Sequence, residues 1–211
     1  MCIRDSSYGA LLAAPFIAVF LLLSFWKNST ENYYSEIMKN DLTEGRMAFE
    51  KQLDIMCAGA FSVSNDSDLK WVYFLDGLKD GDNNIAALIR CNDMLRQTFA
   101  DSEHYQNYSV IMKNELIFRK SGMVVGDKFF YDNYCTYQNT DFETWRKQSF
   151  ESNTWQLFPL EEIDTGERTF QAMTFSYPVR NYIQQEPEAN AVVQFLLSKE
   201  NLEQMFGQLL S

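Results

Sequence analysis

The first part of the chain contains two different patterns of apolar residues. From Tyr8 to Trp26 there are nineteen residues without a charge. As a helix this run would be roughly 28 Å long, close to the thickness of a bilayer's hydrocarbon core, with an aromatic ring at each end. It ends in the bulky Phe25 and Trp26, whereas a signal peptidase needs small residues. We therefore expect residues 8–27 to form an uncleaved transmembrane anchor, preceded at residues 1–7 by a leader foreign to the protein.

The second pattern has the period of a helix that is apolar on one face only. Its members are Tyr34, Met38, Leu42, Gly45, Phe49, Leu53, Met56, Ala60 and Val63. Every gap is three or four residues, which places them in one stripe. We expect residues 28–64 to form a long stalk helix. Because one small lobe cannot cover so long a stripe, we expect its half nearer the membrane to pack against a second copy, in a homodimer.

Residues 65–211 mix helical and strand patterns. A helix is expected from Ile85 to Phe99, a second after the capping box of Thr140 and Glu143, and a last one from Ser198. The strand patterns are a hairpin around a polar turn, an alternating segment and a continuous apolar run. These strands are Ser109–Met112, Leu116–Arg119, Phe170–Val179 and Ala191–Leu197. The chain is therefore predicted to be α+β, with one small antiparallel sheet and its continuous apolar strand at the centre.

Two further segments beside these strands are assigned from their local sequence. Met123–Val125 is expected to extend the hairpin as a short third strand, and the acidic residues from Glu161 to Asp164 are assigned to a loop. Thr140 is expected to be the residue that caps its helix. These assignments leave the aromatic segment from Phe129 to Trp155, apart from the helix expected after Thr140, as a loop-rich segment between two strands.

Composition and charge limit the classes of partner. Hydrophobic residues make up 46% of the chain, which suits a packed domain. The formal charge of −11 argues against a nucleic acid as partner of this segment, because nucleic-acid binding needs a basic face. The cysteines lack the spacing of a metal site. Cys57, Cys91 and Cys135 are either small buried residues or include one disulfide, and the sequence cannot choose the pair.

Candidate chemistry points to binding and not to catalysis. His104 is the only histidine, and no nucleophile, phosphate-loop or dinucleotide motif is present. We therefore expect no enzymatic activity, no catalytic residues, no metal and no cofactor. Aromatic residues are densest between Phe129 and Trp155, where they either pack a core or form the wall of a pocket. The residues that we expect to bind a small ligand there are Arg119, Tyr131, Asp132, Trp145 and Arg146.

The order of these segments resembles that of double-Cache extracytoplasmic sensors. The resemblance rests on the anchor, the stalk helix, the hairpin and three short stretches of sequence. These stretches are Phe-Phe-Tyr-Asp-Asn-Tyr at 129–134, Phe-Glu-Thr-Trp at 142–145 and the apolar run at 191–197. More narrowly, the chain is similar to the sensor regions of membrane-bound AraC-type regulators and histidine kinases of Gram-positive bacteria. The resemblance implies a PAS-like lobe beside a long helix, with the second lobe and the cytoplasmic output missing.

The resemblance also implies a function. Such sensors bind a small molecule outside the cell and pass a shift of a helix inward, so the chain is expected to be extracytoplasmic, anchored in the cell membrane and involved in transcriptional control. The amino-acid-binding members carry an aromatic pair where Trp145 is here followed by Arg146, which argues against an amino-acid ligand. The alternative is a membrane-tethered interaction module that binds a partner protein or a cell-wall component.

Overall fold

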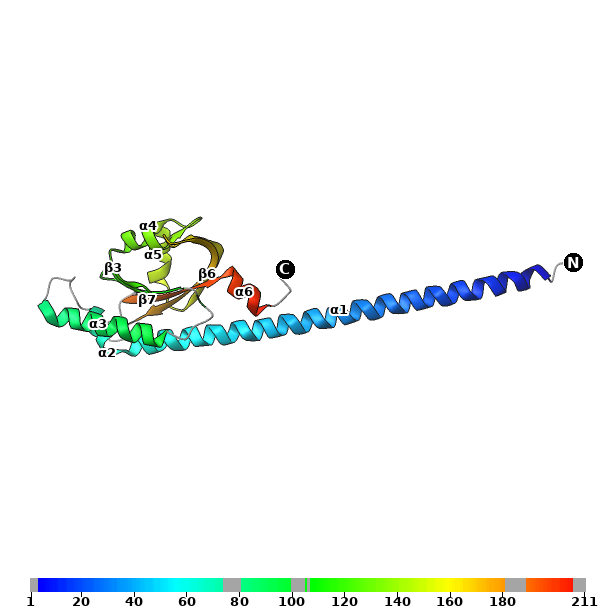
Figure 1. Ribbon diagram of the computed structural model, residues 1–211, viewed down its shortest axis with the longest axis horizontal. Coiled ribbons are helices and arrows are strands. Elements are labelled where there is room, and N and C mark those ends of the chain that lie inside the picture. Colours follow the sequence, from blue (N-terminus) through cyan, green and yellow to red (C-terminus); the bar gives the residue numbers. More distant parts are fainter. Residues whose placement is uncertain (1–3, 74–80, 100–104, 106, 181–188, 207–211) are drawn as a thin grey trace.

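The computed structural model describes residues 4–73, 81–99, 105, 107–180 and 189–206. The side chains of residues 4–22, 25, 28, 71, 73 and 81–84 lie outside this description. His104 and residues 1–3 of the predicted leader also lie outside the described residues. One long helix, α1 (Arg4–Asn65), extends far beyond a compact lobe that contains all the other elements (Figure 1). The predicted long stalk helix is therefore confirmed.

The predicted anchor at residues 8–27 is helical in its backbone, as part of α1. Most of its side chains precede Leu23 and lie outside the described residues. Among the residues that the structure describes, none of the helices combines the length and the apolar character needed to cross a membrane.

Five shorter helices complete the helical part of the described chain. They are α2 (Ser67–Tyr73), α3 (Gly81–Thr98), α4 (Asp127–Tyr134), α5 (Phe142–Glu151) and α6 (Lys199–Met205), with a single break between α1 and α2 at Asp66. The helix is interrupted at Asp66, whose carboxylate accepts a hydrogen bond from the Leu69 backbone N–H at 2.9 Å and so caps α2. The break between α1 and α2 is thus the cap of the second helix.

A seven-stranded antiparallel sheet forms the middle of the lobe, in the order β3-β2-β1-β7-β6-β5-β4. Its strands are β1 (Asn107–Met112), β2 (Leu116–Arg119), β3 (Gly122–Val125), β4 (Thr136–Tyr137), β5 (Gln156–Asp164), β6 (Thr169–Val179) and β7 (Ala191–Ser198). The four predicted strands and the short third strand of the hairpin are confirmed. β7 lies at the centre with every residue buried, which explains why its sequence is apolar without alternation.

Three predictions of local structure were wrong. The aromatic stretch that begins at Phe129 is not a loop, because it lies in helix α4. The acidic segment 161–164 is not a loop either, because it belongs to strand β5. Both segments face the lobe on one side only, so their short patterns are ambiguous without a partner. The third error is the cap of α5, which is Asp141 and not Thr140. The Asp141 carboxylate accepts the Thr144 backbone N–H at 2.8 Å.

The sheet separates two hydrophobic cores (Figure 1). On one face, α1, α2 and α3 pack against side chains such as Val193 and Phe195 of β7; we call this the stalk core. On the other face, α4 and α5 cover Val192 and Leu196 of the same strand; we call this the inner core. Because side chains alternate along a strand, β7 supplies both cores at once.

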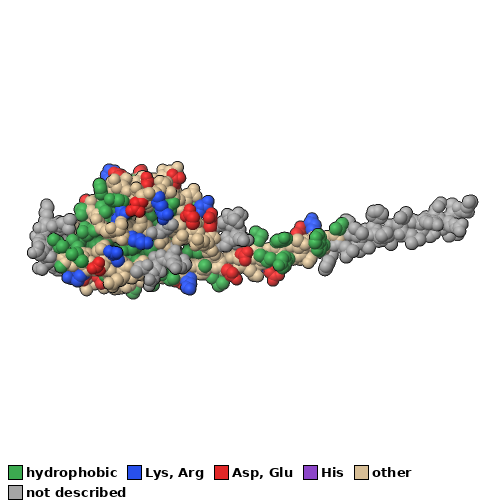
Figure 2. Space-filling model, viewed as in Figure 1, with side chains coloured by type: hydrophobic (Ala, Val, Ile, Leu, Met, Phe, Trp, Pro, Cys, Tyr) green, Lys and Arg blue, Asp and Glu red, His purple; other side chains and the backbone are tan. Residues whose placement is uncertain are grey.

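Only part of the apolar stripe on α1 is covered by the lobe. Met56, Ala60 and Val63 are buried in the stalk core, whereas Tyr34 and Met38 are exposed. Figure 2 shows hydrophobic side chains on the described part of α1 that projects from the lobe. The stripe is therefore confirmed as a packing face near the lobe, and its other half is open to solvent in the single chain.

Candidate functional site

The face of the sheet beneath α4 and α5 carries a row of polar residues. In the strand register, the row runs directly from one strand to the next across β2, β1, β7, β6 and β5. Its members are Arg119, Ser109, Gln194, Ser176 and Gln156. We call it the polar row. Residues that face each other across antiparallel strands point to the same side, so all five side chains lie on the side of the inner core.

Four of the five side chains in the polar row are buried and Gln156 is half-buried, and part of the row's hydrogen-bonding capacity is unused. Gln194 donates from Nε2 to the Ser149 hydroxyl at 2.9 Å, and that hydroxyl donates to the Trp145 carbonyl at 2.7 Å. Gln194 Oε1 and Trp145 Nε1 are buried without a partner among the described residues. Leaving such a group unpaired costs about 1–3 kcal/mol. One acceptor and one donor are thus available between the sheet and α5.

Arg119 lies at the end of the polar row, where the row meets a cavity. Its residue surface is 8% exposed, and its guanidinium carbon lies 3.9 Å from the centre of the Tyr134 ring of α4. An ion pair joins its Nη2 to Glu167 at 3.5 Å, with the Glu167 side chain 76% exposed. The cavity has a volume of about 230 Å³ and opens between β2 and the turn from β5 to β6. A narrow recess, lined by Ser109 and Cys135, continues beneath Tyr134.

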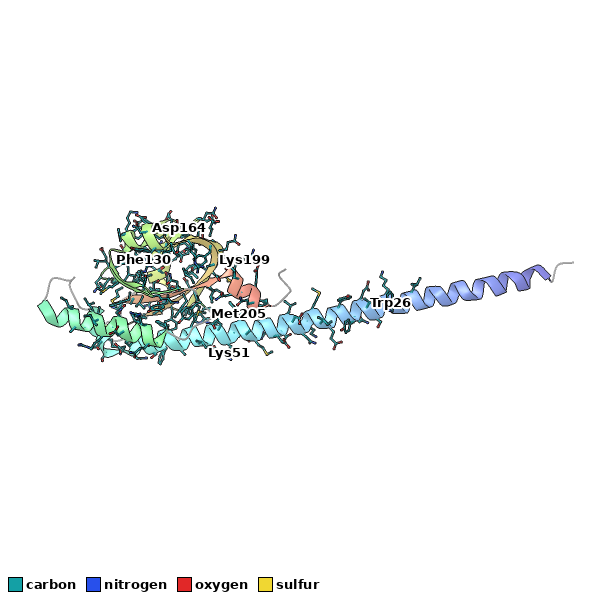
Figure 3. The ribbon with its side chains drawn as sticks, in the orientation of Figure 1. Trp26, Lys51, Phe130, Asp164, Lys199 and Met205 are labelled. Atoms are coloured by element: carbon teal, nitrogen blue, oxygen red, sulfur yellow. The ribbon has the colours of Figure 1, made fainter. Side chains whose placement is uncertain are left out.

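Tyr131 and Trp145, predicted as pocket walls, lie together in the inner core. Their ring centres are 5.4 Å apart, and Trp145 is 4% exposed. The Tyr131 hydroxyl donates to the Thr140 carbonyl. Phe130, labelled in Figure 3, comes from the same helix as Tyr131 and packs on Trp145. These aromatic side chains fill the space between α4, α5 and the sheet, so any ligand there has to contact them from the side of the polar row.

The predicted polar residues are not brought together. Arg146 pairs with the buried Asp127 and does not line the cavity beside Arg119. Asp132 is exposed on the outer side of α4, where it pairs with Lys128 at 3.2 Å. Of the five predicted residues, Arg119 lines the cavity at the end of the polar row, whereas Arg146 lines a separate hollow along α5. The ligand-binding role of the five stays a prediction.

Several residues in this region were missed from sequence. Gln194 had a signal, because it is the one polar residue in the apolar run from Ala191 to Leu197. Ser109 and Ser176 gave none, since serine is common in strands that alternate. Arg168, which lines the cavity beside Arg119, lies 49 residues away in sequence, and the two come together only in the folded sheet.

The titratable groups of the inner core are held neutral. Burial raises the pKa of the Cys135 thiol to about 12 and that of the Tyr137 hydroxyl well above its usual value. The Tyr137 hydroxyl makes a hydrogen bond of 2.9 Å with Thr174, a group that stays neutral at all ordinary pH values. A thiol or phenol in this state is a poor nucleophile. The chemistry that these groups support is reversible binding by hydrogen bonds and apolar contact.

Two predictions about other chemistry concern the cysteines and metals. Cys57, Cys91 and Cys135 are free, and the last two are buried, as the simpler of the two readings expected. The described residues contain no group of three histidine, cysteine, aspartate or glutamate side chains that could hold a metal ion.

Comparison with known proteins identifies the fold. No protein-family model matches the chain, and no curated protein matches it. Among solved structures, the extracellular domain of vpHK1S-Z8, described as a histidine kinase, is similar at 11% identity and a TM-score of 0.55. The match covers 85% of this chain and 62% of that one, so this chain spans less than two thirds of its length. The periplasmic sensory domain of the chemoreceptor Tlp1 from Campylobacter jejuni is also similar, at 11% identity over 80% of this chain and 60% of that one, with a TM-score of 0.49.

The likeness to the vpHK1S-Z8 domain agrees with the α+β arrangement of a long helix beside an antiparallel sheet. The chain shares the fold of that extracellular domain.

Proposed function

We propose that the chain is the extracytoplasmic, ligand-sensing input of a membrane-anchored protein that controls transcription, through an AraC-type regulator or a histidine kinase. The observation that carries the proposal is the polar row. A line of mostly buried polar side chains with an unpaired acceptor on Gln194, beside the unpaired donor of Trp145, destabilises a purely structural core, whereas it supplies orientation and selectivity in a binding site. The shared fold with an extracellular domain supports the sensing role.

Strand β7 connects the proposed site to the stalk. It carries Gln194 in the polar row and ends at Ser198, whose hydroxyl accepts the Asn201 backbone N–H and so caps α6. Helix α6 in turn packs on α1, where the rings of Phe49 and Phe206 are 6.2 Å apart. A ligand that moves β7 therefore displaces α6 along α1. Figure 3 shows Met205 at this contact, on the end of α6 beside the long helix.

In this proposal, α1 connects the lobe to the membrane. The uncharged run of residues 8–27 is proposed as the anchor, on its length and its terminal aromatic rings. The exposed side chains of Tyr34, Met38 and Leu42 form the part of the α1 stripe that the lobe leaves open. We propose that a second copy covers them, because parallel helices bury such a stripe efficiently.

The sensing role is tested by ligand-dependent stability. The full chain in detergent micelles is heated with a panel of small sugars, carboxylates, amino acids and nucleobases, and the midpoint of unfolding is recorded. A ligand at about 100 times its Kd stabilises by about 2.7 kcal/mol, which shifts the midpoint measurably. We expect at least one compound class to raise the midpoint in this way.

Variants of two buried glutamines locate the response. Gln194→Met removes the unpaired acceptor of the polar row, so the ligand-free chain should be as stable as before or more stable, and the shift with ligand should disappear. Gln52→Met is the matched control, because Gln52 is buried on α1 with an unpaired Nε2, on the stalk side of the sheet. A panel without any response favours the tethered interaction module instead. A response that survives Gln194→Met moves the site away from the polar row.

A further inference from the structure

The cavity beside Arg119 has a charge opposite to that of the chain. The whole chain carries a formal charge of −11, yet the described lining of this cavity contains Arg119, Lys120 and Arg168 with Glu167 as its only carboxylate. The described lining is thus positive by two charges. Cations that converge on one concave site in an acidic protein raise the local concentration of anions there.

The side chain of Arg119 is buried, and most of its hydrogen-bond donors are not used by the described residues. Its side chain is 10% exposed, and its guanidinium carbon lies over the Tyr134 ring, 3.9 Å from the ring centre. Only one of its five N–H donors makes a hydrogen bond to a described residue, the one to Glu167 at 3.5 Å. An exposed carboxylate at that distance is a weak partner. The remaining donors form a fixed fork of the kind that binds two oxygens of one anion.

The second arginine is placed by a rigid turn. The Arg168 carbonyl accepts hydrogen bonds from both the backbone N–H and the hydroxyl of Thr165, each at 3.0 Å. Gly166 has φ +75°, and a Cβ there would lie 2.2 Å from the Asn133 carbonyl oxygen of α4. The turn is therefore pressed against α4 at a position that only glycine allows. Neither Arg168 nor Lys120 forms an ion pair with any residue of the described part of the chain, so both charges are available.

We propose that this cavity binds a small oxyanion with two negative charges, such as a dicarboxylate or a phosphate group. Two charges balance the described lining, and the fork of Arg119 fits a pair of oxygens. Drug-sized ligands occupy about 300–1,000 Å³, so the volume of about 230 Å³ suits a smaller molecule. Asn107, Ser121 and Thr165 add neutral hydrogen-bonding groups around it. That the anion is the sensed ligand rests on the proposed function; that it binds does not.

Titration calorimetry on the full chain tests the proposal, with succinate and inorganic phosphate as the two probes at constant ionic strength. Arg168→Gln and Lys120→Gln change exposed residues and should leave the fold intact. Each is expected to weaken binding by about tenfold, the loss of one charge-assisted contact. Arg46→Gln is the matched control, because Arg46 is an exposed arginine of α1 that pairs only with Glu50 among the described residues. Arg119→Lys, which keeps the charge and loses the fork, should also weaken binding by about tenfold or more.

The outcomes separate this proposal from the sensing role. The anion site is supported if either probe binds saturably and if the two cavity variants weaken that binding while Arg46→Gln does not. The probe that binds more tightly then identifies the oxyanion. Binding of neither probe at millimolar concentration overturns the anion site, as does an equal loss in all variants. If a neutral compound stabilises the chain, unaffected by Arg168→Gln, and neither probe binds, the sensing role stands and the anion site is refuted. If succinate or phosphate binds without any change at the α1–α6 contact, the anion site stands and the anion is refuted as the sensed ligand.

Discussion

Replacing Gly45 with alanine tests whether α6 is truly packed on the stalk. In a solvated helix, glycine to alanine stabilises by about 1 kcal/mol. Gly45 is buried where α6 crosses α1. A Cβ at this position would lie 2.4 Å from Phe206 Cδ1, 3.0 Å from Phe206 Cα and 3.1 Å from the Met205 carbonyl oxygen. The ring of Phe206 can rotate away, but the two backbone atoms can move only with α6.

The sign of the effect follows from these contacts. Inserting a methyl group into a tight contact costs about 1–3 kcal/mol, and the gain in helix propensity offsets about 1 kcal/mol of it. We expect Gly45→Ala to lower the free energy of unfolding by up to about 2 kcal/mol. Because α6 is short, it should also separate from α1 more often, and its backbone N–H groups should exchange faster with solvent.

Urea unfolding and hydrogen exchange measure the two effects. Ser62→Ala is the control, since Ser62 is exposed on the same helix and its replacement should raise stability slightly. If Gly45→Ala stabilises the chain by about 1 kcal/mol, as in a free helix, and leaves exchange in α6 unchanged, α6 does not pack on the stalk. The proposed route from β7 to α1 would then have no contact to act through.

Three further predictions concern the inner core and its neighbours. Trp145→Ala should lower the free energy of unfolding by about 3–5 kcal/mol, whereas Trp145→Phe, which also removes the unpaired Nε1, should cost under about 1.5 kcal/mol, both measured by urea unfolding. Arg146→Ala leaves the buried Asp127 without its ion pair and should cost about 1–3 kcal/mol; a loss within about 0.5 kcal/mol, as expected for the exposed Arg46→Ala, would show that the pair is unimportant. Burial raises the pKa of Cys91 to about 12, so at pH 8 only about one molecule in ten thousand carries the thiolate. Mass spectrometry after brief alkylation of the native chain should find half-buried Cys57 labelled before Cys91, and equal labelling of both would contradict the burial of Cys91.

The elements with a long or strict pattern could be predicted from the sequence. The stripe from Tyr34 to Val63 repeats over nine positions, and apolar residues alternate from Met173 to Val179, so each pattern favours one structure. The central place of β7 also followed from its own residues, because a strand buried on both faces needs no polar side. Gly45 could be recognised as a weak point of the helix, with close packing as the condition for tolerating it.

Short amphipathic segments were decided by their neighbours. Residues 127–134 form two turns of helix because Phe130 and Tyr131 find the inner core, and 161–164 form a strand because β6 supplies its hydrogen bonds. Neither partner is visible in the local sequence. A helix of eight residues is marginal alone and is stabilised mainly by burying its apolar side.

The candidate site likewise depends partly on the local sequence and partly on the tertiary structure. The sequence alone shows that aromatic residues gather between Phe129 and Trp155. Whether they line a pocket or fill a core depends on how closely α4 and α5 approach the sheet. The polar row exists only through strand register, which aligns Gln194 with Ser109 and Ser176 from strands far apart in the chain. Arg119 and Arg168 meet because the sheet curls and Gly166 lets the turn approach α4. Periodicity thus determined which elements form and which faces they bury, whereas long-range pairing alone decided which polar side chains converge, because register and curvature arise only when strands combine.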